Sequence, residues 1–205
     1  AAGTHPFSSW QEQEIYPHER YYGVVEEMQD AARRLLIFGM HVHIGMPNME
    51  LGIQLFNMSR YFLPHLLSLS TSSPFWMGRN TGFKSYRSLV FSSFPRSGIP
   101  GHFSSAEDYQ AYVDLLIKTG CIDNGRKIWW DVRPHPVYGT IEVRVFDIAT
   151  KAEDAVALAA LVQALFVKLY KLLEQNLNFR DYHQRLLNEN KWRAVRYGQT
   201  RWAEI

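Results

Sequence analysis

Two stretches of the chain alternate between apolar and polar residues, which is the side-chain period of a β-strand. They are residues 40–46 and residues 138–147. Each alternation predicts a strand with one polar face. In the first strand that face carries His41, His43 and Gly45, and in the second it carries Thr140, Glu142, Arg144 and Phe146.

Other segments repeat their apolar residues every three or four positions, as amphipathic helices do. Asn48 and Ser105 stand directly before two of these segments, where each is a suitable N-cap. Residues 70–105 are rich in Ser, Gly, Pro and aromatic residues and show no clear period, which indicates loops or short elements. The predicted helices are residues 19–36, 48–61, 64–69, 106–118 and 153–173.

The longest predicted helix, residues 153–173, is rich in Ala and Leu and is apolar around most of its circumference, so we expect it to be buried. Its predicted stripe consists of Val156, Ala160, Gln163 or Ala164, and Val167.

A further strand is predicted over residues 128–132. Pro134 and Pro136, which cannot lie inside a central ladder, separate it from the strand at 138–147. Helices and strands without strict alternation predict an α+β fold, in which helices cover an antiparallel sheet.

Composition excludes several classes of protein. The 205 residues are 46% hydrophobic and 20% charged, which excludes a disordered chain. The formal net charge is only +2, so we expect no nucleic-acid partner. The lone Cys121 excludes an internal disulfide and favours a reducing compartment, most simply the cytoplasm. The apolar stretch 155–162 is short for a bilayer span, so we expect no membrane helix.

Two pairs of ionisable residues lie at i and i+2 of the predicted strands, which puts each pair on one face about 6.6 Å apart. His41 and His43 can bind a metal ion or donate to a phosphate, or they can simply lie on a solvated sheet face. Glu142 is an oxygen ligand of the kind that Mg²⁺ uses, and Arg144 has the planar fork that fits a phosphate. The same two residues can also form an ordinary ion pair.

Several basic residues lie among aromatic residues, an arrangement that suits an anionic small molecule. The aromatic residues can equally be loop anchors, with the arginines extending to solvent. No P-loop, Rossmann, serine-hydrolase or zincin motif occurs. The basic residues in question are Arg79, Lys84, Arg87, Arg96 and Arg133.

Four motifs in order along the chain resemble the bacterial and plant type of glutamate-cysteine ligase, in its carboxylate-amine ligase branch. They are GMHVHIG at 39–45, STSSPFWMGRNTG at 70–82, WWDVRP at 129–134 and GTIEVRVFD at 139–147. This family is similar to glutamine synthetase, which carries comparable histidine and Glu-x-Arg strands. The resemblance implies a curved antiparallel sheet covered by helices. It also implies that residues 1–205 are the C-terminal part of a single, longer catalytic domain, without the N-terminal strands and their acidic metal motif.

The same resemblance implies ATP-dependent formation of an amide bond through an acyl phosphate, with γ-glutamylcysteine as one product. His41 and Glu142 would bind Mg²⁺ or Mn²⁺, while His43, Arg144 and Arg133 would contact ATP. Arg79, Arg87 and Arg133 would hold the carboxylate and amine substrates, with Arg87 and Arg144 catalytic. The family also implies a homo-oligomer. Two alternatives stay open from the residues themselves: a metal-dependent amide hydrolase using His41, His43 and Glu142, and a non-catalytic scaffold of the same fold.

Overall fold

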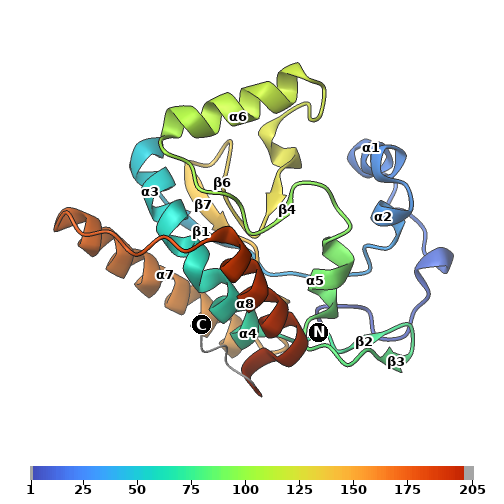
Figure 1. Ribbon diagram of the computed structural model, residues 1–205. Coiled ribbons are helices and arrows are strands. Elements are labelled where there is room, and N and C mark those ends of the chain that lie inside the picture. The colour runs from blue at the N-terminus through green and yellow to red at the C-terminus, as the bar shows by residue number, and fades with distance from the viewer. Residues whose placement is uncertain (1, 201–205) are drawn as a thin grey trace.

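The computed structural model describes residues 2–200, which form a mixed helical and strand structure (Figure 1). This confirms the α+β class. The α-helices are α1 (Glu19–Met28), α2 (Asp30–Arg33), α3 (Met49–Ser59), α4 (Leu63–Ser70), α5 (Tyr86–Phe91), α6 (Ala106–Lys118), α7 (Ala152–Glu174) and α8 (Gln184–Tyr197). Short 3-10 turns are η1 (Trp10–Glu12), η2 (Arg60–Phe62), η3 (Gly125–Lys127) and η4 (Gly198–Thr200).

The strands form three small sheets. The largest has the order β1-β7-β6, and both of its pairings are antiparallel. β2 and β3 form an antiparallel hairpin, and β4 pairs with β5 in parallel. The strands are β1 (Val42–Gly45), β2 (Phe75–Trp76), β3 (Arg79–Asn80), β4 (Ser97–Gly98), β5 (Trp129–Trp130), β6 (Val132–Pro134) and β7 (Thr140–Val143).

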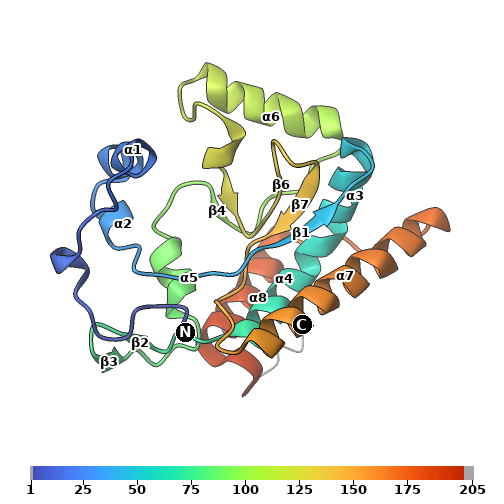
Figure 2. The same cartoon turned by 180° about the vertical axis from the view of Figure 1, so that it is seen from behind.

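Helices α3, α4, α7 and α8 gather on one side of the β1-β7-β6 sheet, and α1 and α2 lie on the opposite side of the molecule (Figures 1 and 2). The apolar faces of β1 and β7 meet α3 and α7, so that Ile141, Val143 and Phe56 are at most 1% exposed. The polar face of the sheet therefore points away from the core helices. This arrangement follows from the alternation in sequence, since a strand with one buried face presents its polar residues on the other.

The predicted helix starts are confirmed at two positions. The Asn48 side chain accepts a hydrogen bond from the Leu51 amide at 2.9 Å, and Ser105 accepts one from the Asp108 amide at 3.1 Å. Each satisfies an amide in the first turn of its helix that has no partner within the helix.

The predicted helix over residues 19–36 is wrong in its length. It is divided at Gln29, which has φ of 49° in the left-handed region, and α2 ends at Arg33. α1 has no buried residue, so little tertiary packing is available to keep the two segments in one continuous helix.

The prediction for α7 is wrong in its burial and in its face. Its buried residues are Leu158, Val162, Phe166 and Leu169, whereas Val156 is 70% and Val167 is 48% exposed. The faces of this helix differ little in hydrophobicity, because apolar residues occur on all sides of it. In the described part of the chain α7 is the one helix long and apolar enough to cross a membrane by length and composition alone, a test that the core helix of a globular protein also passes. One side of it nevertheless packs against α3 and β1.

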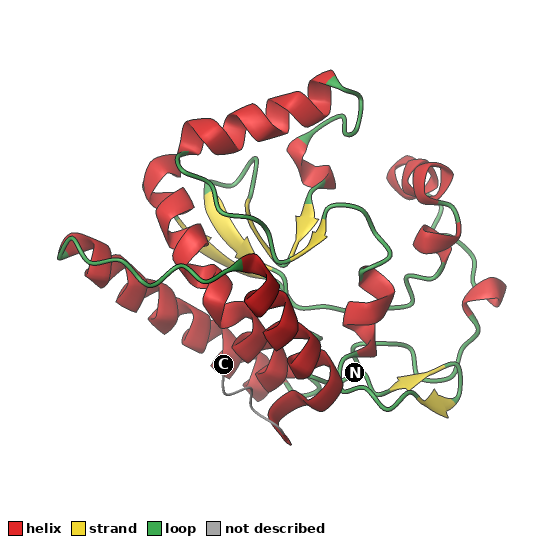
Figure 3. Cartoon of the chain, viewed as in Figure 1, coloured by secondary structure: helices red, strands yellow, loops and turns green. Residues whose placement is uncertain are grey.

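Elements at two places were not predicted. Residues 70–105 contain the hairpin β2–β3, helix α5 and strand β4 (Figure 3), and α8 lies beyond the last predicted helix. Pro134 lies inside β6, where it was expected to interrupt pairing. It fits because β6 is an edge strand and the neighbouring His135 amide donates to Thr140 at 2.8 Å, so the Pro134 nitrogen points away from β7.

Candidate functional site

A row of charged side chains crosses the polar face of the main sheet. The strand register places Glu142 of β7 opposite His43 of β1 on one side and opposite Arg133 of β6 on the other. His41 and Arg144 lie at the next positions on the same face, with Arg144 Nη1 3.4 Å from His41 Nδ1. The structure thus confirms that the His41/His43 and Glu142/Arg144 pairs face one another.

Glu142 is the centre of this cluster and is only 3% exposed. Its Oε1 atom lies 2.7 Å from Arg144 Nη1, 2.9 Å from His41 Nδ1 and 3.7 Å from His43 Nε2. Its Oε2 atom accepts a hydrogen bond from Arg133 Nε at 2.7 Å. Two guanidinium groups therefore share one carboxylate, which leaves a positive charge uncompensated within the cluster.

These contacts shift the protonation equilibria of the cluster. Burial by itself raises the pKa of Glu142, but the hydrogen bond from His41 and the charges of Arg144 and Arg133 outweigh it, so the pKa lies well below its ordinary value. Burial lowers the pKa of His41, which favours the neutral ring at neutral pH. Burial and the neighbouring charge of Arg133 lower the pKa of Arg144 to about 10, so this residue remains charged.

Arg87 projects from α5 and is 6% exposed. Its Nη2 atom donates to the Arg144 carbonyl oxygen at 3.5 Å, and Nε has no hydrogen-bond partner. Gly39 makes room for the guanidinium, because a Cβ atom at that position would lie 2.5 Å from Arg87 Nη2. The absent side chain at Gly39 is thus a requirement for the position of Arg87.

A buried carboxylate orients the backbone around Arg87. Asp147 is fully buried and accepts hydrogen bonds from Ser73 Oγ at 2.7 Å, Ser85 Oγ at 2.8 Å and the Ser72 amide at 2.9 Å. Burial raises the pKa of Asp147, while the charge of Arg87 and these hydrogen bonds oppose that effect. Sequence reasoning missed this network, although Ser72, Ser73 and Asp147 lie within the family-like motifs.

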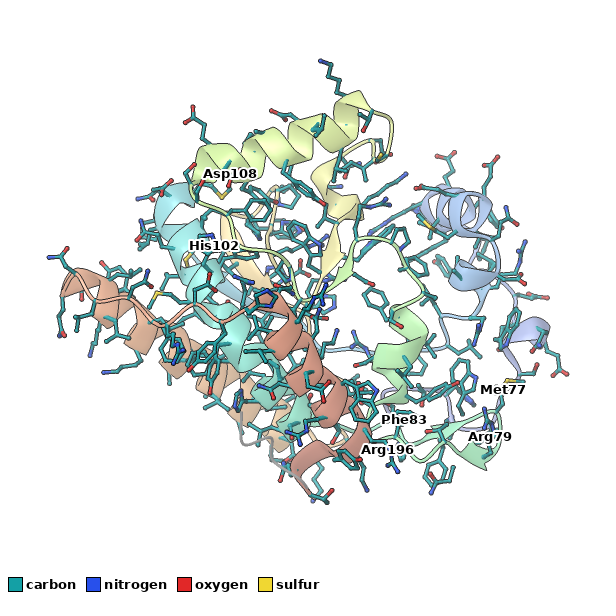
Figure 4. The ribbon with its side chains drawn as sticks, viewed as in Figure 1. Met77, Arg79, Phe83, His102, Asp108 and Arg196 are labelled. Atoms are coloured by element: carbon teal, nitrogen blue, oxygen red, sulfur yellow. The ribbon has the colours of Figure 1, made fainter. Side chains whose placement is uncertain are left out.

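Arg79 does not join the cluster. It is exposed at the end of the β2–β3 hairpin, beside Met77 and far below the main sheet (Figure 4). Of the predicted site residues, the structure brings together His41, His43, Arg87, Arg133, Glu142 and Arg144.

A cavity of about 390 Å³ opens beside this cluster. His41, Arg87 and Arg144 form its polar side, and most of the remaining lining comes from residues 13–37, around α1 and α2. Sequence analysis did not predict this wall, since no motif marks these residues. The apolar and aromatic lining includes Ile15, Tyr16, Tyr21, Val25, Leu36 and Phe91.

The other end of the cluster carries a second feature that sequence reasoning missed. The rings of His135 and Tyr138 stack with their centroids 4.2 Å apart, and the His135 ring lies 5.5 Å from that of His43. Aromatic residues at i and i+3 of a turn are the one signal in sequence that could have indicated this stack.

The site has limited capacity for a metal ion. Within residues 2–200 no group of three or more His, Cys, Asp or Glu side chains is arranged to hold one. His41 binds Glu142 through Nδ1, which leaves Nε2 as the nitrogen able to act as a ligand, in the way that a carboxylate commonly orients a metal-binding histidine. The chain can therefore offer part of a ligand set.

Comparison with known proteins shows the family to which the chain belongs. The model of glutamate-cysteine ligase family 2 matches residues 1–204. A relative from Herpetosiphon aurantiacus, named "Putative glutamate--cysteine ligase 2", is 68% identical over 198 residues, which are 97% of this chain and 51% of the relative. Relatives with the same name are 68% identical in Chloroflexus aurantiacus, with the same coverage, and 62% identical in Sorangium cellulosum, covering 97% of this chain and 53% of the relative. The chain spans about half the length of these relatives.

Proposed function

Because the chain belongs to glutamate-cysteine ligase family 2, we propose that it carries part of the site of an ATP-dependent carboxylate-amine ligase. The observation that supports this function is the uncompensated positive charge around Glu142, beside a cavity that Arg87 and Arg144 also line. A reaction that brings a nucleotide and a carboxylate together needs such a charge. Glutamate and cysteine are the substrates that the names of the relatives suggest.

In the proposed reaction a carboxylate oxygen of the acid attacks the γ-phosphorus of ATP, and ADP leaves. The nitrogen of the amine then attacks the carbonyl carbon of the acyl phosphate, inorganic phosphate leaves, and one proton is released. Negative charge accumulates on phosphoryl oxygens in the first step and on the carbonyl oxygen in the second. Preorganised guanidinium groups in a site with little water stabilise both.

Each residue of the cluster has a place in this proposal. Arg144 and His43 contact the transferred phosphoryl group, and Arg87 holds the carboxylate of the acid. Arg133 uses Nε for Glu142 and Nη1 for the carbonyl oxygens of Arg126 and Ile128, so its contribution is mainly its charge. Arg79 takes no part, since it lies outside the cluster.

We propose that ATP binds together with Mg²⁺ or Mn²⁺, which supply charge neutralisation at the phosphates when bound. His41 Nε2 can ligate such an ion directly. Both oxygens of Glu142 are already hydrogen-bonded to His41, Arg144 and Arg133, so its coordination of an ion requires one of these partners to move. The remaining ligands must come from outside the residues described.

The fold of the whole catalytic domain, its oligomeric state and its location in the cell are also proposals. The β1-β7-β6 sheet would belong to the curved antiparallel sheet of a glutamine-synthetase-like fold, in one catalytic domain of a cytoplasmic homo-oligomer. The order and antiparallel pairing of these strands are compatible with that fold.

The decisive experiment measures ADP release. The full-length protein is incubated with ATP, Mg²⁺ and panels of carboxylic acids and amines, glutamate and cysteine included. A ligase releases ADP only when an acceptor acid is present. An enzyme that cleaves amides without ATP would contradict the proposal and favour a metal-dependent hydrolase. Absence of ADP release with every acid would also contradict it.

A further inference from the structure

The cavity beside Arg87 and Arg144 differs strongly between its two sides. One side contains His41, Arg87 and Arg144. The opposite wall is largely aliphatic and aromatic, and its polar residues are Gln13, Glu14 and Arg33. Glu14 is the one carboxylate in the described lining, and it is exposed. The cavity therefore offers guanidinium groups for an anion but no buried acceptor for an ammonium group.

Arg87 has far fewer partners than a buried guanidinium needs. It has five N–H donors, yet in the described part of the chain its side chain makes a single hydrogen bond, of 3.5 Å, to the Arg144 carbonyl oxygen. No carboxylate among the described residues lies within ion-pair distance of it. The carboxylates of Asp147 and Asp131 balance its charge from beyond that distance, and its guanidinium lies 5.7 Å from the centre of the Phe91 ring. Its unused N–H donors are still able to receive an anion from the cavity.

The opposite wall offers apolar side chains to a ligand in the cavity. α1 has no buried residue, although Tyr21 and Val25 face the cavity together with Leu36 from the segment after α2. Tyr21 is 48% exposed. An apolar group placed in the cavity would remove these side chains from water and gain free energy from the buried area.

We propose that this cavity binds a carboxylic acid with an apolar, arylalkyl or alkyl body, its carboxylate on Arg87 and Arg144 and its body against the α1–α2 wall. That this acid is the substrate to be activated rests on the ligase function proposed above. Arg144 belongs both to the cluster around Glu142 and to the cavity. Its Nη1 atom contacts Glu142, and the residue also lines the cavity. A carboxylate held there is adjacent to the proposed phosphoryl position.

Isothermal titration calorimetry with 4-phenylbutyrate tests the binding site. We expect 4-phenylbutyrate to bind at least tenfold more tightly than glutamate, and more tightly than 4-phenylbutyramide, which has the same shape without the charge. Val25→Glu should weaken binding at least tenfold, whereas Val156→Glu, an equivalent change on the exposed face of α7, should not. Leu36→Ala provides a second wall variant should Val25→Glu fail to fold, and it should weaken binding severalfold.

Three results would overturn this inference: equal affinity for the acid and its amide, tighter binding of glutamate, or displacement of 4-phenylbutyrate by ATP alone, which would assign the cavity to the nucleotide. ADP release separates the two proposals. ADP release with glutamate but neither binding nor turnover of 4-phenylbutyrate removes the inference and leaves the ligase. Binding in the expected pattern without ADP release from any acid supports the site and removes the ligase.

Discussion

Replacing Glu142 by Gln tests the central role of this carboxylate in the cluster. The change removes one negative charge that contacts Arg133 and Arg144 at 2.7 Å and His41 at 2.9 Å. Removing one partner of a buried ion pair costs about 3–5 kcal/mol, because the remaining charge stays buried without compensation. Gln keeps one acceptor oxygen, so we expect a loss near the lower limit, about 3 kcal/mol in the free energy of unfolding.

The loss can be measured by urea denaturation followed through the fluorescence of the six tryptophans. For a chain of this length about 3 kcal/mol corresponds to a decrease in Tm of roughly 6–12 °C. Glu189→Gln is the matched control, since Glu189 is exposed on α8 and forms no ion pair within the described residues. A loss below about 1 kcal/mol, or equal to that of the control, would refute the electrostatic argument.

The pH dependence of the free energy of unfolding, compared between wild type and Glu142→Gln, gives a second test. The pKa of Glu142 is lowered from its ordinary value of 4.5 in the folded protein, so the unfolded chain takes up the proton first as the pH falls. The stabilisation by Glu142 is therefore fully present above about pH 4.5 and decreases below it. The difference between wild type and Glu142→Gln should stay constant from pH 8 to pH 5 and shrink at lower pH. A difference that grows as the pH falls would contradict the direction of the shift.

Three further changes follow from the site. Arg144→Lys should reduce kcat/KM for ADP release about 100-fold or more while the urea midpoint stays unchanged, because an ammonium group cannot reproduce the guanidinium fork; a rate equal to wild type would exclude Arg144 from the site. Gly39→Ala should displace the Arg87 guanidinium and raise KM for the acid more than it lowers kcat in steady-state kinetics, and unchanged KM would contradict this. Ser85→Ala should cost about 1–3 kcal/mol in urea denaturation, since it removes a 2.8 Å hydrogen bond from the buried carboxylate of Asp147, and a cost near zero would contradict that role.

The sequence was informative where a local pattern determines the structure. Alternation predicted that His41, His43, Glu142 and Arg144 share the polar face of the sheet, because the strand period is two whatever the tertiary context. It was wrong for Phe146, which lies beyond the end of β7 and is fully buried in the core. The N-caps Asn48 and Ser105 were predictable for the same reason, since a side-chain oxygen satisfies an amide only two or three residues away.

What depends on distant contacts was not predictable. The buried face of α7 is determined by β1 and α3, and a helix that is apolar on all sides gives no contrast from which to choose it. The α1–α2 wall of the cavity comes from a segment without a motif, separated at Gln29 by a left-handed residue that no local signal demands. Arg79 resembled Arg87 in its sequence setting, but the β2–β3 hairpin carries it away from the cluster.

The position of Pro134 has a consequence for how the main sheet can be extended. Within the described residues β6 and β1 are the two outer strands, and each has one side without a neighbouring strand. On β6 the proline nitrogen lacks a hydrogen exactly where an incoming chain would seek a donor, whereas β1 contains no proline. An additional strand would therefore pair more readily beyond β1, where it would lie next to His43 and contribute side chains to the same polar face.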